Sequence, residues 1–235
     1  MPYFFQDDLS QDSFELSSEE SKHVLKSMRL KVGSFIWITD GKGTLAKAVI
    51  ANICKTDCVV EIVERNFLNY RMRKNFHLVV APTKNQHRIE WLVEKIVEIG
   101  VTQLTFIICD RSERKHVDLH RLHRIAIAAL KQSQGIWLPK IKIMPFQTFL
   151  EESKNLNASK WIAACDDKTE PIEIATIKFQ QEDTIFLIGP EGDFTSQELI
   201  IAKKSGFQQV TLGSKILRTE TAALFATCCF AVNKG

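Results

Sequence analysis

The 235-residue sequence lacks the features of membrane-spanning and secreted proteins. No apolar run approaches the about 18 residues that a membrane-spanning helix needs, so we expect no transmembrane segment. The first residues, MPYFFQDD, have neither a basic stretch nor a long apolar core, so we expect no signal peptide. None of the six cysteines forms a C-x-x-C pair, which indicates reduced thiols in a cytoplasmic protein and no metal site.

The common fingerprints of nucleotide-binding and hydrolytic enzymes are also missing. The sequence contains no G-x-G-x-x-G, G-x-x-x-x-G-K-[ST], H-E-x-x-H or G-x-S-x-G motif. The first absence argues against an oxidoreductase that binds a nicotinamide cofactor. A ligand held mainly by backbone, without a diphosphate cradle, is the remaining possibility for an enzyme of this composition.

Residues 1–70 read as short strands and turns. The segment Phe35–Thr39 is rich in β-branched and aromatic residues and is followed by the turn Asp40-Gly41-Lys42-Gly43. Two further strands are expected at 45–51 and 58–63, and a helix at 18–28, capped by Ser18. This pattern predicts a small β-barrel module, with a domain boundary near 69–75.

Residues 75–235 alternate between strands and helices, which predicts a parallel sheet with helices on both faces. The expected strands are 76–82, 104–109, 160–165, 184–188 and 209–212. The expected helices are one that ends at Gly100, one at 119–134, one from the capping box at Thr195 and Glu198 to Gly206, and one at 219–232. We expect Cys228 and Cys229, in the last of these, to fill the core.

Two glycine-containing loops stand out because each follows an expected strand and the second opens the last helix. The first is Ile188-Gly189-Pro190-Glu191-Gly192, and the second runs from Leu212-Gly213 to Arg218 and Glu220. Ligands of an open parallel sheet bind beyond the carboxyl ends of its strands, and glycine lets backbone approach them closely. The two loops therefore predict a small-molecule pocket with charged groups at its mouth.

The formal net charge of +3 is too small to prove a nucleic-acid partner, but the charge is unevenly distributed. Basic residues cluster at 71–74 and again at 111–124, where histidines are interleaved. Such density either binds phosphates or forms an ordinary solvated face, and charge alone favours the second.

The two glycine loops together resemble the signature of the RsmE family, which are bacterial 16S ribosomal RNA (uridine-N3) methyltransferases of the SPOUT superfamily. The likeness extends through most of the chain, at His23 to Gly33, Lys84, Arg88, Lys95, 98–101, 112–114 and 121–125. The sequence departs from the family pattern at Tyr3, Lys131, Gly135, Asp193 and Lys215.

The resemblance implies an α/β protein with an N-terminal PUA-like β-barrel for RNA (1–70) and a C-terminal SPOUT methyltransferase domain with a parallel sheet and a trefoil knot (75–235). It also implies S-adenosyl-L-methionine as cofactor and a cytoplasmic homodimer without membrane contact. The substrate would be 16S ribosomal RNA, in the small ribosomal subunit, and the product 3-methyluridine in its decoding region.

The resemblance assigns site residues as well. Arg218 would stabilise negative charge on the uridine carbonyls, and Glu220 would act as the base or orient Arg218; an ion pair of Arg218 with Glu220 or Glu191 is the structural alternative. Cofactor contacts are expected from Leu187, Ile188, Gly189, Pro190, Glu191, Gly192, Leu212, Gly213, Ile216 and Leu217, although the leucines and Ile216 are equally suited to a core. RNA contacts are expected from Arg29, Lys31, Arg111, Arg114 and Arg124. A noncatalytic RNA-binding protein that keeps the same fold is the main alternative.

Overall fold

A computed structural model describes residues 1–67, 75–164, 171–179 and 183–232. The chain forms two compact units, one of residues 1–72 with 127–138 and one of residues 73–126 with 139–235. The segment 127–138 therefore groups with the first unit, whereas the predicted domain 75–235 included it. Most of the expected boundary at 69–75 lies outside the described residues.

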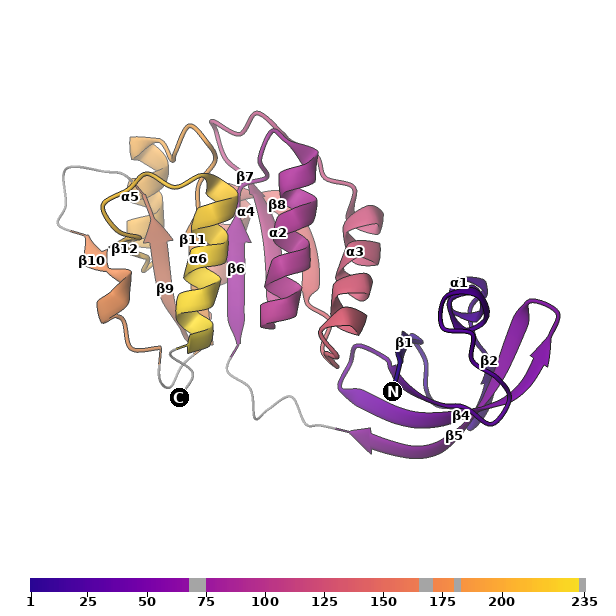
Figure 1. Cartoon of the computed structure of the whole chain (residues 1–235). Helices are drawn as coiled ribbons and strands as arrows, with labels where there is room; N and C mark the ends of the chain where they lie inside the picture. Colours follow the sequence, from indigo (N-terminus) through magenta and orange to yellow (C-terminus); the bar gives the residue numbers. More distant parts are fainter. Residues whose placement is uncertain (68–74, 165–170, 180–182, 233–235) are drawn as a thin grey trace. The chain divides into compact units, whose positions relative to one another are not determined.

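The first unit is built on one mixed sheet whose strands follow the order β1-β3-β4-β5-β2 (Figure 1). β1 pairs with β3 in parallel, and the other pairs are antiparallel. The strands are β1 (Tyr3–Phe5), β2 (Ser13–Glu15), β3 (Phe35–Thr39), β4 (Thr44–Cys54) and β5 (Asp57–Phe67). In the described residues this ladder does not close, because β1 and β2 form its two edges, so the predicted barrel is an open five-stranded sheet.

Alternation of side chains along the strands produces the core of the first unit. Inward positions of β3 and β4 carry Ile36, Ile38, Ala46, Ala48 and Ile50, which are fully buried. The helix expected at 18–28 is shorter: α1 (Ser18–Lys22) is capped by Ser17, not Ser18, and continues as a π-helical turn to Ser27. Arg29 follows with φ of 50°, in the left-handed region.

The first unit contains Lys131 and Gly135, two positions at which the sequence departs from the family pattern. The Lys131 ammonium lies 2.6 Å from the carboxylate of Glu20, a buried residue of α1, so a lysine here neutralises a buried charge. A side chain at Gly135 would begin 2.7 Å from a methyl group of the buried Leu130. The ion pair therefore explains Lys131, whereas a larger residue at 135 would require the Leu130 side chain to shift.

The second unit is a seven-stranded sheet of order β10-β12-β9-β11-β6-β7-β8 in which every described pair is parallel (Figure 1). Its strands are β6 (Phe76–Val80), β7 (Gln103–Ile108), β8 (Lys140–Pro145), β9 (Ala158–Ala163), β10 (Ile172–Glu173), β11 (Asp183–Ile188) and β12 (Gln208–Thr211). The helices that follow or join them are α2 (Gln86–Ile99), α3 (Leu119–Gln132), α4 (Phe146–Ser153), α5 (Ser196–Lys204) and α6 (Thr219–Val232), with a 3-10 turn at Ile174–Thr176.

Helices cover both faces of this sheet, as the alternating pattern predicts. On one face α2 and α6 lie side by side over β6, and the Phe76 ring stacks on Phe230 of α6 at 4.5 Å (Figure 1). On the other face α4 and α5 enclose a core that contains Val79, Ile185 and Leu187. β11 lies between β6 and β9, so the chain brings the carboxyl ends of β9, β11 and β12 together.

One detail of α6 differs from expectation. Cys228 is exposed and Cys229 is half-buried, so the prediction that they fill the core is wrong. The same helix exposes Phe225, and the neighbouring α2 exposes Trp91. α6 is apolar on all sides, and periodicity therefore could not tell its packed side from its free side.

His77, in β6, has a strongly lowered pKa. Its Nε2 atom lies 2.8 Å from the Thr105 hydroxyl, and Phe149 meets the ring edge-on. Burial, followed by the positive charge of Lys142, lowers the pKa of His77 to about 4 from an ordinary value of 6.5. The folded protein therefore keeps this imidazole neutral at pH values where the unfolded chain binds a proton.

We predict that the free energy of unfolding falls as the pH is lowered from about 6.5 to about 4, because only the unfolded state protonates His77 in this window. The full contribution of this group is roughly 3 kcal/mol. Urea denaturation at a series of pH values measures it. His77→Gln removes the titrating group and should flatten the curve in this range, and a variant with the wild-type slope would contradict the assignment.

Candidate active site

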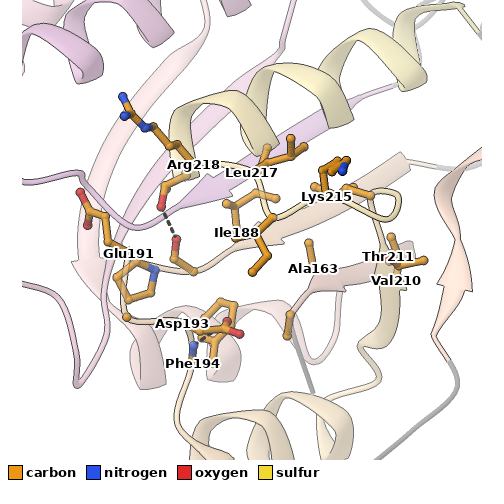
Figure 2. Close-up of a pocket in the computed structure, with 18 of the residues that line it drawn as sticks. Ala163, Ile188, Glu191, Asp193, Phe194, Val210, Thr211, Lys215, Leu217 and Arg218 are labelled. Carbon is orange, nitrogen blue, oxygen red and sulfur yellow. Dashed lines mark hydrogen bonds between the residues drawn. The ribbon is translucent and has the colours of Figure 1, made fainter. Parts of the chain in front are cut away.

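A cavity of about 880 Å³ lies at the carboxyl ends of β9, β11 and β12 (Figure 2). This volume is in the range of pockets that hold cofactors and other small molecules. Its walls include nine of the ten residues predicted for the cofactor: Ile188, Gly189, Pro190, Glu191, Gly192, Leu212, Gly213, Ile216 and Leu217. The two glycine loops, separated by α5 and β12 in the sequence, are thus brought to one site.

Leu187 is the exception among the predicted cofactor residues. It does not line the cavity, because its side chain is fully buried in the core beneath α4 and α5. Successive residues of a strand point to opposite faces, so Ile188 reaches the cavity where Leu187 cannot. The assignment of Leu187 to the cofactor is therefore corrected to a core role.

The first loop depends on a close approach at Gly189. A Cβ atom at this position would lie 3.0 Å from the Phe194 ring, which is buried in the same core as Leu187. Asp193 precedes that phenylalanine with φ of 59°, and its carboxylate accepts a hydrogen bond from the Phe194 amide at 2.7 Å. The loop is thus anchored to the core by Phe194 while its glycine backbone faces the cavity.

The second loop leaves large side chains uncovered beside the cavity. Gly213 has φ of 114°, a conformation that favours glycine. Ile216 is 91% exposed, although it is one of the larger apolar residues of the chain. The Thr219 hydroxyl donates to the carbonyl of Gly189 at 3.1 Å, and this bond, dashed in Figure 2, ties the second loop to the first.

Arg218 and Glu220 stand in different surroundings. Arg218 is exposed, and in Figure 2 its guanidinium points away from Ile188 and Leu217. It forms no ion pair with Glu220 or Glu191, both of which lie in the described part of the chain. The ion pair that was the structural alternative to a catalytic role for Arg218 is therefore not formed.

Glu220 is buried and pairs with Arg88 at the start of α2, with 3.4 Å between Nε and Oε1. Its second oxygen, Oε2, is buried and has no hydrogen-bond partner among the described residues, and Glu220 is not one of the residues that line the cavity. Sequence reasoning cited Arg88 only as part of the family resemblance and attached no chemistry to it. The contact depends on the packing of α2 against α6, which no local pattern reveals.

The five basic residues predicted for RNA fall into two groups. Arg29, Lys31 and Arg124 have exposed side chains. Arg111 donates to the carbonyl of Gly192 at 2.8 Å, and Arg114 donates to those of Thr83 and Lys84 at 3.0 and 2.7 Å. The last two guanidinium groups thus hold backbone within the second unit.

Among the described residues, no group of three or more His, Cys, Asp or Glu side chains is placed to hold a metal ion. No helix there is long and apolar enough to cross a membrane.

Comparisons with known proteins agree with this arrangement. A family model described as an RNA methyltransferase domain matches residues 71–231, and one described as an RNA methyltransferase PUA domain matches residues 16–63. The ribosomal RNA small subunit methyltransferase E of Buchnera aphidicola is 30% identical over 95% of this chain and 89% of its own length.

Solved structures show the same likeness. A probable rRNA-methyltransferase from Porphyromonas gingivalis superposes with a TM-score of 0.90 and 36% identity, over 97% of this chain and 96% of that one. A ribosomal RNA small subunit methyltransferase E from Neisseria gonorrhoeae, bound to S-adenosyl methionine, superposes with a TM-score of 0.84 and 27% identity, over 100% and 98%.

A PUA-like unit joined to a parallel sheet with a backbone-lined cavity at its carboxyl edge defines the class of RNA methyltransferases. Within that class, the chain belongs to the family of ribosomal RNA small subunit methyltransferase E.

The contact between Gly189 and Phe194 can be tested by adding one methyl group. We predict that Gly189→Ala destabilises the protein by about 1–3 kcal/mol, because the new Cβ overlaps a ring that the core holds in place. Gly192→Ala is the matched control, since its nearest neighbours are at 3.4 Å, and it should change stability by less than about 1 kcal/mol. Urea denaturation followed by tryptophan fluorescence measures both, and equal effects would contradict the proposed packing.

Proposed function

We propose that this protein transfers a methyl group from S-adenosyl-L-methionine to N3 of a uridine in the decoding region of 16S ribosomal RNA. The observation that carries the proposal is the cavity between the two glycine loops, with the guanidinium of Arg218, which has no ion-pair partner in the described part of the chain, at its edge. The names of the relatives supply the substrate class, and the bound ligand of the Neisseria gonorrhoeae structure supplies the cofactor.

The residues of the cavity fit such a cofactor. Gly189 and Gly213 line the cavity with peptide groups that an adenosine can contact, and Ile216 and Leu217 offer apolar surface to its rings. Glu191 and Asp193 line the same cavity and place carboxylates near a positively charged ligand. When bound, S-adenosyl-L-methionine supplies an electrophilic methyl group.

The reaction requires the uridine N3 proton to leave and the resulting anion to be stabilised. Within the described ranges Arg218 has no carboxylate partner, so its guanidinium can donate to the uracil carbonyls as negative charge develops on them. Glu220 contacts Arg88 and not Arg218, which argues against its role in orienting Arg218. Glu220 remains the proposed acceptor for the N3 proton: its Oε2 has no hydrogen-bond partner among the described residues, but in the free protein the side chain is buried outside the cavity lining and must turn toward the substrate to act.

RNA binding in this proposal uses the exposed residues Arg29 and Lys31 of the first unit and Arg124 of α3. The basic side chains would contact phosphates and position the target uridine without reading sequence directly. We propose that the substrate is the RNA in the small ribosomal subunit, that the enzyme acts in the cytoplasm, and that the loop 212–218 belongs to the trefoil knot of its superfamily.

Transfer of labelled methyl groups tests the function. We predict that the wild-type protein labels 16S RNA of small subunits from a strain deleted for the corresponding enzyme, at uridine N3. Arg218→Ala should lower the rate constant of transfer roughly 10²- to 10³-fold, because one donor to a developing charge is lost. Glu220→Gln, which cannot accept the proton, should lower it as well.

The matched control is Lys203→Ala, which removes the same charge from an exposed position of α5 and should leave the rate unchanged. Binding of subunits without any labelled product would favour the noncatalytic alternative. Label at another atom of the base would refute the assignment to N3.

The proposed homodimer has a candidate surface. Trp91 of α2 and Phe225 of α6 are 42% and 41% exposed on two helices that pack side by side. Apolar surface of this kind, on adjacent helices, is typical of protein interfaces. We propose that a second copy of the chain covers it.

We predict that the wild-type protein sediments with twice the mass of the 26.8 kDa chain and that Trp91→Glu converts it to monomer. Ile200→Glu, on an exposed apolar residue of α5, is the matched control and should leave the dimer intact. A monomeric wild-type protein, or a dimeric Trp91→Glu variant, would contradict this surface.

A further inference from the structure

The clamp segment, Asp110–Arg114, follows β7 and forms hydrogen bonds with the loop after β6 and with the region after β11. It reaches the loop after β6 through Arg114, whose guanidinium holds the carbonyls of Thr83 and Lys84. It reaches the region after β11 through Asp110, whose amide donates to Glu198 at 2.9 Å, and through Arg111. The clamp segment therefore joins the loop after β6 to the loop after β11.

The clamp segment is itself fixed to β7. The buried Ser112 hydroxyl accepts from the amide of Cys109 at 3.0 Å, and the Ser112 amide donates to the carbonyl of Cys109 at 3.1 Å. This tight turn leaves Arg111 projecting from a rigid base. Arg111 is the member of the clamp segment that lines the 880 Å³ cavity.

Arg111 contacts the first glycine loop, residues 189–194, which is called the cofactor loop below, at the residue with positive φ. Its Nη1 atom donates to the carbonyl of Gly192 at 2.8 Å and to that of Phe194 at 3.4 Å. These carbonyls stand on either side of Asp193, the residue with φ of 59°. Aspartate adopts the left-handed region more readily than most residues, and the two bonds from Arg111 fix the carbonyls on either side of it.

The hydrocarbon part of the Arg111 side chain also contacts the loop. Its Cβ and Cδ atoms lie 3.4 Å from the position that a Cβ of Gly192 would occupy, so the stem lies close against the glycine backbone. On the other side of the loop, the Glu191 carboxylate accepts from the amide of Lys84, which the Arg114 guanidinium holds through its carbonyl. The loop 189–194 is thus fixed before any ligand arrives.

We propose that Arg111 is a positioning residue for the cofactor loop and not an RNA contact. Its guanidinium keeps residues 192–194 in the conformation that leaves the cavity open, so its loss weakens binding of the cofactor and leaves binding of RNA intact. This inference rests on the proposed function, because it takes S-adenosyl-L-methionine as the ligand of the cavity.

Isothermal titration with S-adenosyl-L-methionine tests the inference without a catalytic readout. We expect Arg111→Ala to raise the dissociation constant roughly 5- to 20-fold, the effect of losing charge-assisted hydrogen bonds at a partly solvated site. Arg111→Lys keeps the charge but not the planar fork, so it should bind more weakly than wild type and more tightly than Arg111→Ala. If Arg111→Ala does not fold, Arg111→Lys decides the question alone.

The Michaelis constants separate positioning from RNA contact. In Arg111→Ala the KM for S-adenosyl-L-methionine should rise while the KM for small subunits stays within about twofold of wild type. Arg124→Ala should show the opposite pattern, with unchanged cofactor binding. Cofactor binding by Arg111→Ala at the wild-type level, or a rise confined to the KM for subunits, would overturn the inference.

The two proposals fail in different ways. A wild-type protein that does not bind S-adenosyl-L-methionine would refute the proposed function, and this inference with it. A wild-type protein that binds it, together with an Arg111→Ala variant that binds it equally well, would refute the inference alone.

Discussion

The contact of the Phe194 ring with the bare backbone of Gly189 is the constraint on which the cavity depends. Because no side chain stands at residue 189, the ring can enter the core of the second unit and draw the loop 189–194 against the end of β11. The opposite side of the loop then presents peptide groups to the cavity. Thr219 joins the loop after β12 to the same glycine, so one close approach organises both walls.

The charged residues of the second unit divide between building the site and acting in it. Arg111 and Arg114 donate hydrogen bonds to backbone carbonyls, and Arg88 forms an ion pair with Glu220. Arg218 has no such partner in the described residues. A guanidinium that the fold does not use for its own stability is available to a substrate, which is the physical basis for giving Arg218 the catalytic role and the others positioning roles.

Much of this arrangement could be predicted from the sequence. The capping box at Thr195, the left-handed end of α2 at Gly100, and the helix Thr219–Val232 are confirmed because each follows from local backbone chemistry. The strand β8 and helix α4, at 140–153, carry weaker signals and were not predicted. The core position of Leu187 and the ion pair of Arg88 were not predicted because they depend on which strand face or neighbouring helix these residues meet, and those contacts join residues far apart in the chain.

Hydrogen–deuterium exchange with and without S-adenosyl-L-methionine tests the central claim most directly. The account predicts that the cofactor slows exchange of backbone amides in 188–194 and 211–218, and leaves the strands of the first unit unchanged, because the glycine loops are the surface that it covers. Protection confined to other segments, with these two loops exchanging as in the free protein, would contradict it.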